Sequence, residues 1–482
     1  MPISSLPSPY GIGTLGAEAR KFVDFLAAGG QSCWQVLPLG PTSYGDSPYQ
    51  SFSSFAGNPY FIDLDVLAEW GLLEPGEYQN VNWGDDPSRV NYEVLYQNRF
   101  DVLRLACARL TRGDKFEMRG VLWGADWLED YALFMALKDK YGGAPWLEWP
   151  EDIRLRQPQA MEQARKELRE EVDFWRWVQH LFYAQWWDLK EYANQKGVSI
   201  IGDLPIYVAM DSADVWAEPE FFQLGEGHLP TEVSGVPPDY FSADGQLWGN
   251  PLYNYARMEK DGFGWWIRRI EGAGRLFDII RIDHFRGLES YWAVPYGAKT
   301  AKGGCWRKGP GMKLVGTLTG WFPDLKIIAE DLGFLTPEVH KLLADSKLPG
   351  MKVLEFAFDA REPSNYLPHT YERNCVCYVG THDNETVMQW REQADRSDIS
   401  MARKYLGLND AEGFNWGMIR GGMSSTADTF VVQMQDCLGL GAEGRMNTPG
   451  KADGNWQWRL LPGEATPSLA KKLREYVRIY GR

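Results

Sequence analysis

Cysteine and histidine are scarce in this chain of 482 residues, which contains six of each. Six scattered cysteines are too few to form a disulfide framework. Cys375 and Cys377 lie one residue apart in an apolar run, which favours a buried strand over a metal site. No metal-ligand spacing relates the histidines at 180, 228, 340 and 369. The sequence therefore predicts neither a metal site nor an organic cofactor.

Long apolar runs and an excess of basic charge are also absent. No run reaches 18 apolar residues, which excludes a transmembrane helix. The opening Met-Pro-Ile-Ser-Ser lacks the basic region and apolar core of a signal peptide. Acidic residues outnumber basic ones by 65 to 50, and the net charge of −15 argues against nucleic-acid and anionic-membrane partners. We therefore expect a soluble, cytoplasmic protein.

Aromatic residues, by contrast, are abundant, with 22 Trp, 23 Tyr and 22 Phe. Most of them are expected in the core, because aromatic side chains bury large areas. Many nevertheless lie in stretches rich in glycine and proline, such as residues 41–60 and 230–255. Aromatic rings in loops are flat platforms for sugars or nucleobases, and the acidic charge of the chain disfavours nucleobases.

Seven short apolar runs, mostly rich in β-branched residues, are typical of parallel strands that are buried on both faces. They occupy residues 33–37, 199–203, 278–283, 326–330, 351–355, 376–379 and 429–432. The carboxylates Asp283, Glu330, Glu355 and Asp383 follow one another at intervals of 47, 25 and 28 residues. Because a strand–helix unit needs about 30 residues, the pattern predicts an α/β fold, a TIM (β/α)8 barrel.

A bare barrel takes about 250 residues, so we expect large inserted subdomains in the loops at the C-terminal face of the strands. Residues 1–482 are predicted to form a single catalytic barrel. Residues 64–196 should form a mainly helical insertion. Residues 205–264 should form a loop-rich insertion that includes an active-site lid at about 235–249.

Helix signals are clear at three places. Residues 16–28 have an apolar face with the helical period and end at a glycine pair. A longer helix before Gly197 has one apolar stripe, formed by Val172, Trp175, Val178, Phe182, Trp186, Leu189 and Ala193. Thr466 and Pro467 are the N-cap and first residue of a last helix that runs to Tyr480. We expect no C-terminal β-sandwich after it.

Three carboxylates, Asp283, Glu330 and Asp383, follow predicted strands, where β/α barrels place their active sites. Arg281 lies two residues before Asp283 and therefore on the same face of the strand. The guanidinium should keep Asp283 ionised by charge attraction. Glu330 follows Ile-Ile-Ala, and a drier environment should raise its pKa. One ionised and one protonated carboxyl group form the pair that cleaves a glycosidic bond.

Each of these carboxylates, taken alone, could instead be the N-cap of the following helix. Their number, and the neighbouring Arg281 and His382, favour a catalytic interpretation. His382 is a candidate donor to a sugar hydroxyl, whereas His284 should point to the opposite face, which favours a structural role. The pattern G-x-G-x-x-G at residues 11–16 has no preceding strand, and we reject a dinucleotide site there.

Several longer motifs carry a resemblance to a known family. They are Ser8-Pro-Tyr-Gly-Ile-Gly-Thr-Leu-Gly16, Gln35-Val-Leu-Pro-Leu-Gly-Pro41, Tyr44-Gly-Asp-Ser-Pro-Tyr49, Gly202-Asp-Leu-Pro-Ile-Tyr207, Arg281-Ile-Asp-His-Phe-Arg-Gly287, Ala329-Glu-Asp-Leu-Gly333 and Gly380-Thr-His-Asp-Asn-Glu-Thr386. In these motifs and their order the chain resembles the amylomaltases. These are the 4-α-glucanotransferases or disproportionating enzymes, glycoside hydrolase family 77 of the α-amylase clan.

The resemblance implies a retaining transfer of α-1,4-glucan segments between malto-oligosaccharides or glucans. It implies Asp283 as nucleophile, Glu330 as acid/base and Asp383 as transition-state stabiliser. It further implies substrate contacts from Arg281, His382, Asp203, Tyr49, Asp239, Trp248 and Asn447. The reaction needs no metal or organic cofactor.

Two alternatives use the same residues. A retaining α-glucan hydrolase would share the carboxylates and would raise the number of reducing ends. A glucan-binding protein without activity would show no turnover, and the three intact carboxylates argue against it. For the lid at 235–249, the alternative is a plain loop packed on the barrel, with Trp248 as a core residue.

Overall fold

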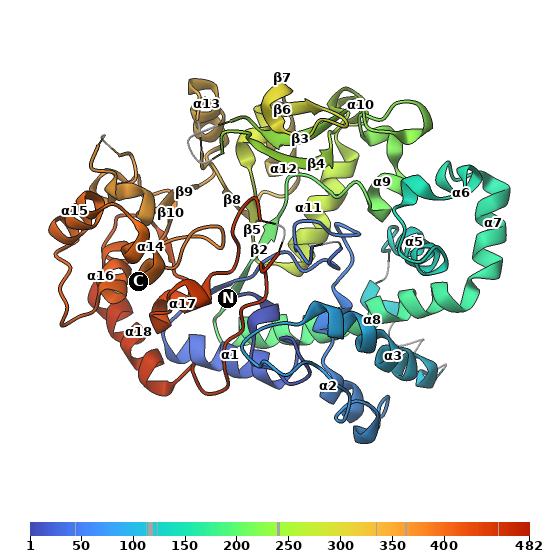
Figure 1. Cartoon of the computed structure of the whole chain (residues 1–482), viewed down its shortest axis with the longest axis horizontal. Helices are drawn as coiled ribbons and strands as arrows, with labels where there is room; N and C mark the ends of the chain where they lie inside the picture. Colours follow the sequence, from blue (N-terminus) through green and yellow to red (C-terminus); the bar gives the residue numbers. More distant parts are fainter. Residues whose placement is uncertain are drawn as a thin grey trace.

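The computed structural model describes residues 1–43, 45–111, 113, 119–122, 124–238, 242–333, 335–361, 364–451 and 453–482. The seven predicted runs are all strands, and the strands form two parallel sheets (Figure 1). The first sheet has the order β1-β2-β5-β8, with β1 (Cys33–Gln35), β2 (Ser199–Leu204), β5 (Ile279–Ile282) and β8 (Lys326–Ala329). The second has the order β11-β10-β9, with β9 (Gly350–Val353), β10 (Cys375–Tyr378) and β11 (Thr429–Val431). The fold is therefore a mixed α/β fold, as predicted.

Both parallel sheets contribute to one hydrophobic interior. Its buried members are Ile201, Ile328, Met351, Val376 and Tyr378, and Cys33, Ile279, Leu332 and Val431 pack against them. The backbone N–H of Ala329, at the end of β8, donates to the carbonyl of Pro349, just before β9, at 2.9 Å. The two sheets therefore pack around a common core.

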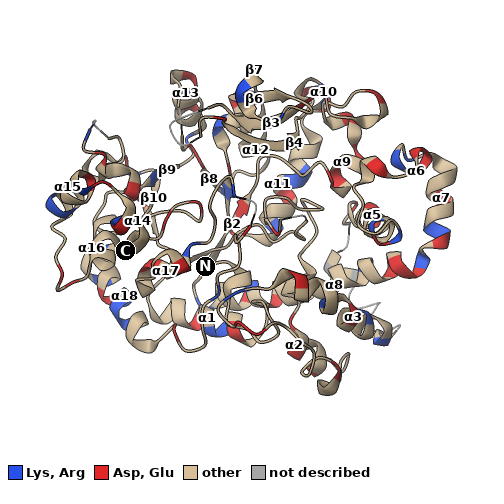
Figure 2. Cartoon of the chain, in the orientation of Figure 1, with Lys and Arg blue, Asp and Glu red and all other residues tan. Residues whose placement is uncertain are grey.

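The described part of residues 64–196 is helical and contains no strand. Its helices are α2 (Leu64–Glu69), α3 (Tyr92–Arg109), α5 (Leu128–Lys140), α6 (Glu151–Arg154), α7 (Pro158–Glu167) and α8 (Arg169–Gln195). All seven members of the predicted apolar stripe are buried along α8. Acidic and basic residues both lie along the outer helices α6 and α7 (Figure 2).

A four-stranded antiparallel sheet lies above the parallel strands in the view of Figure 1. Its order is β4-β3-β6-β7, with β3 (Glu232–Val236), β4 (Gln246–Pro251), β6 (Ser290–Pro295) and β7 (Cys305–Lys308). The segment 205–264, which we expected to be mostly loop, thus contains two strands as well as α9 (Ala213–Ala217) and α10 (Tyr255–Lys260). Trp248 lies in strand β4 and not in a loop. Local composition did not reveal β3, because it pairs with β6, which is more than 50 residues away in the sequence.

The remaining helices surround the strands. They are α1 (Ala17–Ala28), α11 (Gly264–Leu276), α12 (Met312–Trp321), α13 (Pro337–Ser346), α14 (Val387–Gln393), α15 (Arg396–Leu406), α16 (Phe414–Met423), α17 (Met434–Leu438) and α18 (Pro467–Tyr480). The predictions for α1 and α18 are confirmed, and the Thr466 hydroxyl accepts the Leu469 N–H at 3.0 Å as the N-cap of α18. Across the described residues, every helix is too short or too polar to cross a membrane.

Candidate active site

Strand register brings the candidate carboxylates together. Ile282 of β5 is paired with Ala329 of β8, so Asp283 and Glu330 follow directly on two neighbouring strands. The ladder continues past the strand ends, because the Glu330 N–H donates to the Ile282 carbonyl at 3.0 Å. Neighbouring strands are about 4.8 Å apart. The two carboxylates therefore lie side by side at the ends of adjacent strands.

Arg281 is the centre of an ion-pair network. Its Nη1 donates to both carboxylate oxygens of Asp203 at 2.7 Å and to Oδ1 of Asp283 at 3.0 Å. Arg281 and Asp203 are paired in the register of β5 and β2. The Asp203 side chain is fully enclosed, whereas 27% of the Asp283 side chain is exposed. The predicted alignment of Arg281 with Asp283 is confirmed, and Asp203 lies behind the guanidinium.

Glu330 is held by backbone donors. The His284 N–H donates to Oε2 and the Leu332 N–H donates to Oε1, both at 2.7 Å. Glu330 is 7% exposed. Among the described residues no ion pair joins Glu330 to a basic side chain, since Arg281 is paired with the two aspartates. Glu330 thus has the dry environment that the preceding apolar residues predicted.

Desolvation is the largest cause that shifts both pKa values, and it raises the pKa of Asp283 and of Glu330. Arg281 acts in the opposite direction on both, and Asp203 raises the pKa of Asp283 further by repulsion. The raised pKa of Glu330 is confirmed. The expectation that Arg281 would keep Asp283 ionised is wrong. Its single guanidinium is shared by Asp203 and Asp283 and does not offset the rise in the pKa of Asp283 that burial causes. The pair retains a proton to higher pH than an isolated carboxyl group does.

Asp383 lies after β10 on a more open wall of the site, with 48% of its side chain exposed. Its Oδ1 accepts the Asn447 side-chain N–H at 2.6 Å and lies 3.4 Å from His382 Nε2. Arg445 donates to the Asp383 carbonyl at 3.1 Å. The structure thus brings Asn447 to Asp383 and His382, from which the sequence separates it by more than 60 residues.

Tyr49 connects two parts of the site. Its hydroxyl donates to Asp203 Oδ2 at 2.6 Å. Its ring stacks on His382 with centroids 5.2 Å apart and an interplanar angle of 23°. Trp456 lies against both rings, at 5.8 and 5.7 Å. Sequence analysis missed Trp456, and its only signal was a tryptophan among polar and glycine residues near the C-terminus.

Trp248, in strand β4, contacts the turn that follows Asp283. Its ring meets His284 edge-on, with centroids 4.8 Å apart and an interplanar angle of 83°. The side chain is partly buried against the core. Asp239, the other candidate of the same segment, lies outside the described residues. His284, which we expected to be structural, therefore contacts Trp248 through its ring and Glu330 through its backbone.

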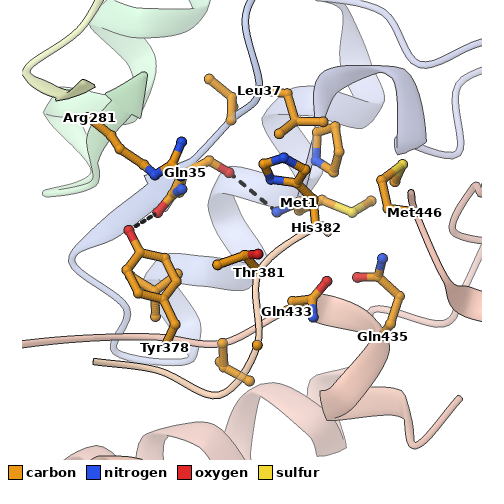
Figure 3. A pocket seen from close by; sticks show the side chains of 15 residues that line it. Met1, Gln35, Leu37, Arg281, Tyr378, Thr381, His382, Gln433, Gln435 and Met446 are labelled. Atoms are coloured by element: carbon orange, nitrogen blue, oxygen red, sulfur yellow. Dashed lines mark hydrogen bonds between the residues drawn. The ribbon is translucent and has the colours of Figure 1, made fainter. Parts of the chain in front are cut away.

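A cavity of about 60 Å³ borders Arg281 and His382 at the ends of β1, β10 and β11 (Figure 3). Figure 3 shows Gln35, Gln433 and Gln435 on its wall, and the Tyr378 hydroxyl donates to Gln35 Oε1 at 2.8 Å. The volume suits a few water molecules and not a sugar ring. Within the described ranges, no group of three or more His, Cys, Asp or Glu is arranged to hold a metal ion.

Comparison with known proteins identifies the family. The model of the 4-alpha-glucanotransferases, glycoside hydrolase family 77, matches residues 1–464. The chain belongs to this family. As a 4-alpha-glucanotransferase it is an enzyme, and it transfers segments of α-glucan. The resemblance that the sequence motifs indicated is confirmed.

Individual 4-alpha-glucanotransferases are similar over their whole length. That of Clostridium butyricum is 49% identical over 485 residues, which cover 100% of both chains. That of Thermus thermophilus is 49% identical over 486 residues, which cover 98% of this chain and 96% of the relative. The amylomaltase from Streptococcus agalactiae in complex with acarbose is 41% identical, with a TM-score of 0.98 over 100% of this chain and 98% of that one. The fold of this 4-alpha-glucanotransferase is therefore that of an amylomaltase.

Proposed function

We propose that Asp283, Glu330 and Asp383 catalyse a retaining transfer of α-1,4-glucan segments to the 4-hydroxyl of an acceptor. The observation that carries this proposal is the register of β5 and β8, which places Asp283 beside Glu330. Retaining enzymes use two carboxyl groups about 5–5.5 Å apart, one as nucleophile and one as acid/base. Neighbouring parallel strands supply a spacing of this order.

The contacts of the two carboxyl groups support the assignment of roles. Arg281 donates directly to Asp283 and not to Glu330, and this contact favours the ionised form of Asp283 against the burial and the charge of Asp203 that raise its pKa. Glu330 is the more buried of the two and, among the described residues, has no cation in contact. On these contacts we assign the shared proton to Glu330, which makes Asp283 the nucleophile and Glu330 the acid.

The reaction proceeds in two displacements. Glu330 gives its proton to the glycosidic oxygen while a carboxylate oxygen of Asp283 forms a bond to the anomeric carbon. The bond between that carbon and the glycosidic oxygen breaks, and the leaving sugar departs with a free 4-hydroxyl. Glu330, now a carboxylate, takes the proton of the acceptor hydroxyl, whose oxygen displaces Asp283.

The surrounding side chains orient the sugar and the nucleophile. Asp383, with Asn447 and His382 in contact, accepts hydrogen bonds from hydroxyls of the distorted ring. Asp203 is enclosed, so it acts by holding Arg281 and Tyr49 in place. Trp248 offers an aromatic face to the acceptor and excludes water, which favours transfer over hydrolysis.

The proposed architecture of the chain is one TIM-type barrel. The shared core of the two parallel sheets supports it, and so does the hydrogen bond from Tyr378 of β10 to Gln35 of β1. Residues 64–196 and 205–264 are insertions that build the walls of the substrate groove. Malto-oligosaccharides are the substrates, and the similar amylomaltase solved with acarbose supports this class.

Two measurements test the proposal. Maltotriose should give glucose and longer oligomers with little change in total reducing ends, whereas a steady rise in reducing ends would contradict transfer. Glu330→Gln should fail on maltotriose but still react with an α-maltosyl fluoride, because fluoride leaves without a proton. Mass spectrometry of the quenched variant should find the glycosyl group on the peptide with Asp283. A label on Asp383 would reverse the two roles.

A further inference from the structure

The residue after the nucleophile has an unusual backbone conformation. His284 lies in the left-handed region, with φ 49° and ψ 46°, which few residues with a side chain adopt. This turn ends the extended segment of β5 and begins the short helix Phe285–Leu288. It directs the His284 N–H at Oε2 of Glu330, 2.7 Å away. Such a hydrogen bond stabilises the carboxylate form of Glu330 over its acid form.

The imidazole ring of His284 is closely packed on two sides. On one side it meets the ring of Trp248 edge-on, at 4.8 Å. On another lies Gly287, where a Cβ atom would come within 3.0 Å of the imidazole Cδ2 and 2.8 Å of Ile206. The Gly287 N–H donates to the His284 carbonyl at 2.9 Å and closes the turn. The turn is therefore closely packed, with Gly287 on one side of the ring and Trp248 on another.

The imidazole of His284 is a weak base. Burial, together with the charge of Arg286, lowers the pKa of His284 to about 3. The ring is therefore neutral near pH 7, and its contact with Trp248 is one of packing. The backbone N–H of His284 contacts Glu330, and the packing of the imidazole ring fixes the direction of this N–H.

We propose that His284 is a positioning residue that couples strand β4 to the acid/base: packing of Trp248 on the imidazole aims the His284 N–H at Glu330. This inference rests on the proposed role of Glu330. With Trp248 in place, Glu330 accepts the hydrogen bond and releases its proton readily. When Trp248 shifts, for example to contact a sugar, the hydrogen bond weakens and Glu330 holds its proton more firmly. Strand β4, whose Trp248 contacts the acceptor, thereby adjusts the pKa of Glu330, the group that deprotonates the acceptor hydroxyl.

Other groups act on the proton of Glu330, and a test must leave them unchanged. They are Arg281 and Asp283 from β5, the neighbouring Asp331, Tyr366 after β9 and Tyr378 of β10. Substitutions at His284 and Trp248 alter none of these charges. Removing a ring can also admit water, which lowers the pKa of Glu330, so a shift of the limb to higher pH is the change that reports loss of the backbone hydrogen bond.

The experiment measures kcat/KM against pH for His284→Asn, His284→Gly and Trp248→Ala. Asparagine and glycine both accept the left-handed conformation, so the turn can form without the ring. With maltotriose, the alkaline limb should move to higher pH by about half to one unit in all three variants. With α-maltosyl fluoride, whose first step needs no acid, Glu330 sets no alkaline limb and no shift is expected.

Three controls isolate the coupling. Trp248→Phe keeps an aromatic partner and should retain the wild-type limb. The double variant Trp248→Ala/His284→Asn should shift no further than either single variant, because both remove the same support. His340→Asn, at an exposed position of α13, should change nothing.

Distinct results overturn the coupling and the proposed function. A purely structural role of His284 would lower activity and melting temperature without moving the limb, and that outcome would refute the coupling. An acidic shift, or full additivity in the double variant, would refute it as well. If Glu330→Gln were still active on maltotriose, the assignment of Glu330 itself would fall, whatever the His284 variants show.

Discussion

Replacing Asp203 by asparagine should lower the pKa of Asp283. Asp203 and Asp283 share Nη1 of Arg281, and Asp203 is fully enclosed behind the guanidinium. The substitution keeps the shape of the side chain and an oxygen that can accept hydrogen bonds from Arg281 and Tyr49. It removes one negative charge, so the whole charge of Arg281 acts on Asp283.

The size of the effect follows from the geometry. The two hydrogen bonds, 2.7 and 3.0 Å long, place the carboxylate oxygens no more than about 5.7 Å apart. With an effective dielectric constant of about 20, two unit charges at this separation repel by about 3 kcal/mol. One pKa unit corresponds to about 1.4 kcal/mol. We therefore expect the pKa of Asp283 to fall by about one to two units.

The assay is the pH dependence of kcat/KM for maltotriose, which reports the groups of the free enzyme. Because Asp283 must be ionised to attack, the acid limb of the Asp203→Asn profile should move to lower pH by that amount. Asp101→Asn, an exposed aspartate on α3, is the matched control and should leave the limb unchanged. Asp203→Asn should also melt at a lower temperature than the wild type, because buried Arg281 loses one of its two counter-charges.

An acid limb that stays in place, or moves to higher pH, would refute the reasoning. If the limb stays in place, a group other than Asp283 sets it. If the limb moves to higher pH, the loss of Asp203 has displaced Arg281 from Asp283. A measured shift together with an unchanged Glu330-dependent alkaline limb would locate the effect at the nucleophile.

Three further predictions concern other parts of the molecule. Trp248→Ala should reduce transfer by roughly ten- to a hundredfold, the loss expected for one stacking contact of about 1–3 kcal/mol, and should raise the ratio of hydrolysis to transfer; an unchanged ratio with a lower melting temperature would favour a core role. Burial raises the pKa of Asp436 to about 7, so the folded state keeps a proton that the unfolded chain loses above about pH 4. Stability from this group is lost as pH rises to 7, and Asp436→Asn should raise the melting temperature more at pH 8 than at pH 5; an equal or opposite change would contradict the burial argument. Gly202→Ala in β2 would place a Cβ 2.1 Å from Phe277 and should destabilise the fold by about 1–3 kcal/mol in denaturant unfolding, whereas Gly76→Ala, with open space around it, should cost much less.

The sequence alone determined the positions of the parallel strands and of the three helices α1, α8 and α18. The parallel strands are buried on both faces, so each is a continuous apolar run that composition reveals. The apolar stripe of α8 and the N-cap of α18 are likewise local patterns of a few turns. The carboxylates Asp283 and Glu330 could be predicted for the same reason, because they follow directly on such runs.

Tertiary structure decided how these residues act on one another. Strand β3 pairs with β4 and with distant β6, and the two strands contain the glycines Gly235 and Gly249 and the proline Pro251, which local patterns associate with loops. The gathering of Tyr49, His382 and Trp456 joins residues from both ends of the chain. The pKa of Asp283 departs from the expected direction because burial and the charge of Asp203 depend on packing, which no local pattern encodes. The packing of Gly287 and Trp248 against the His284 ring likewise joins distant segments, and contacts of this kind are formed by the folded chain as a whole.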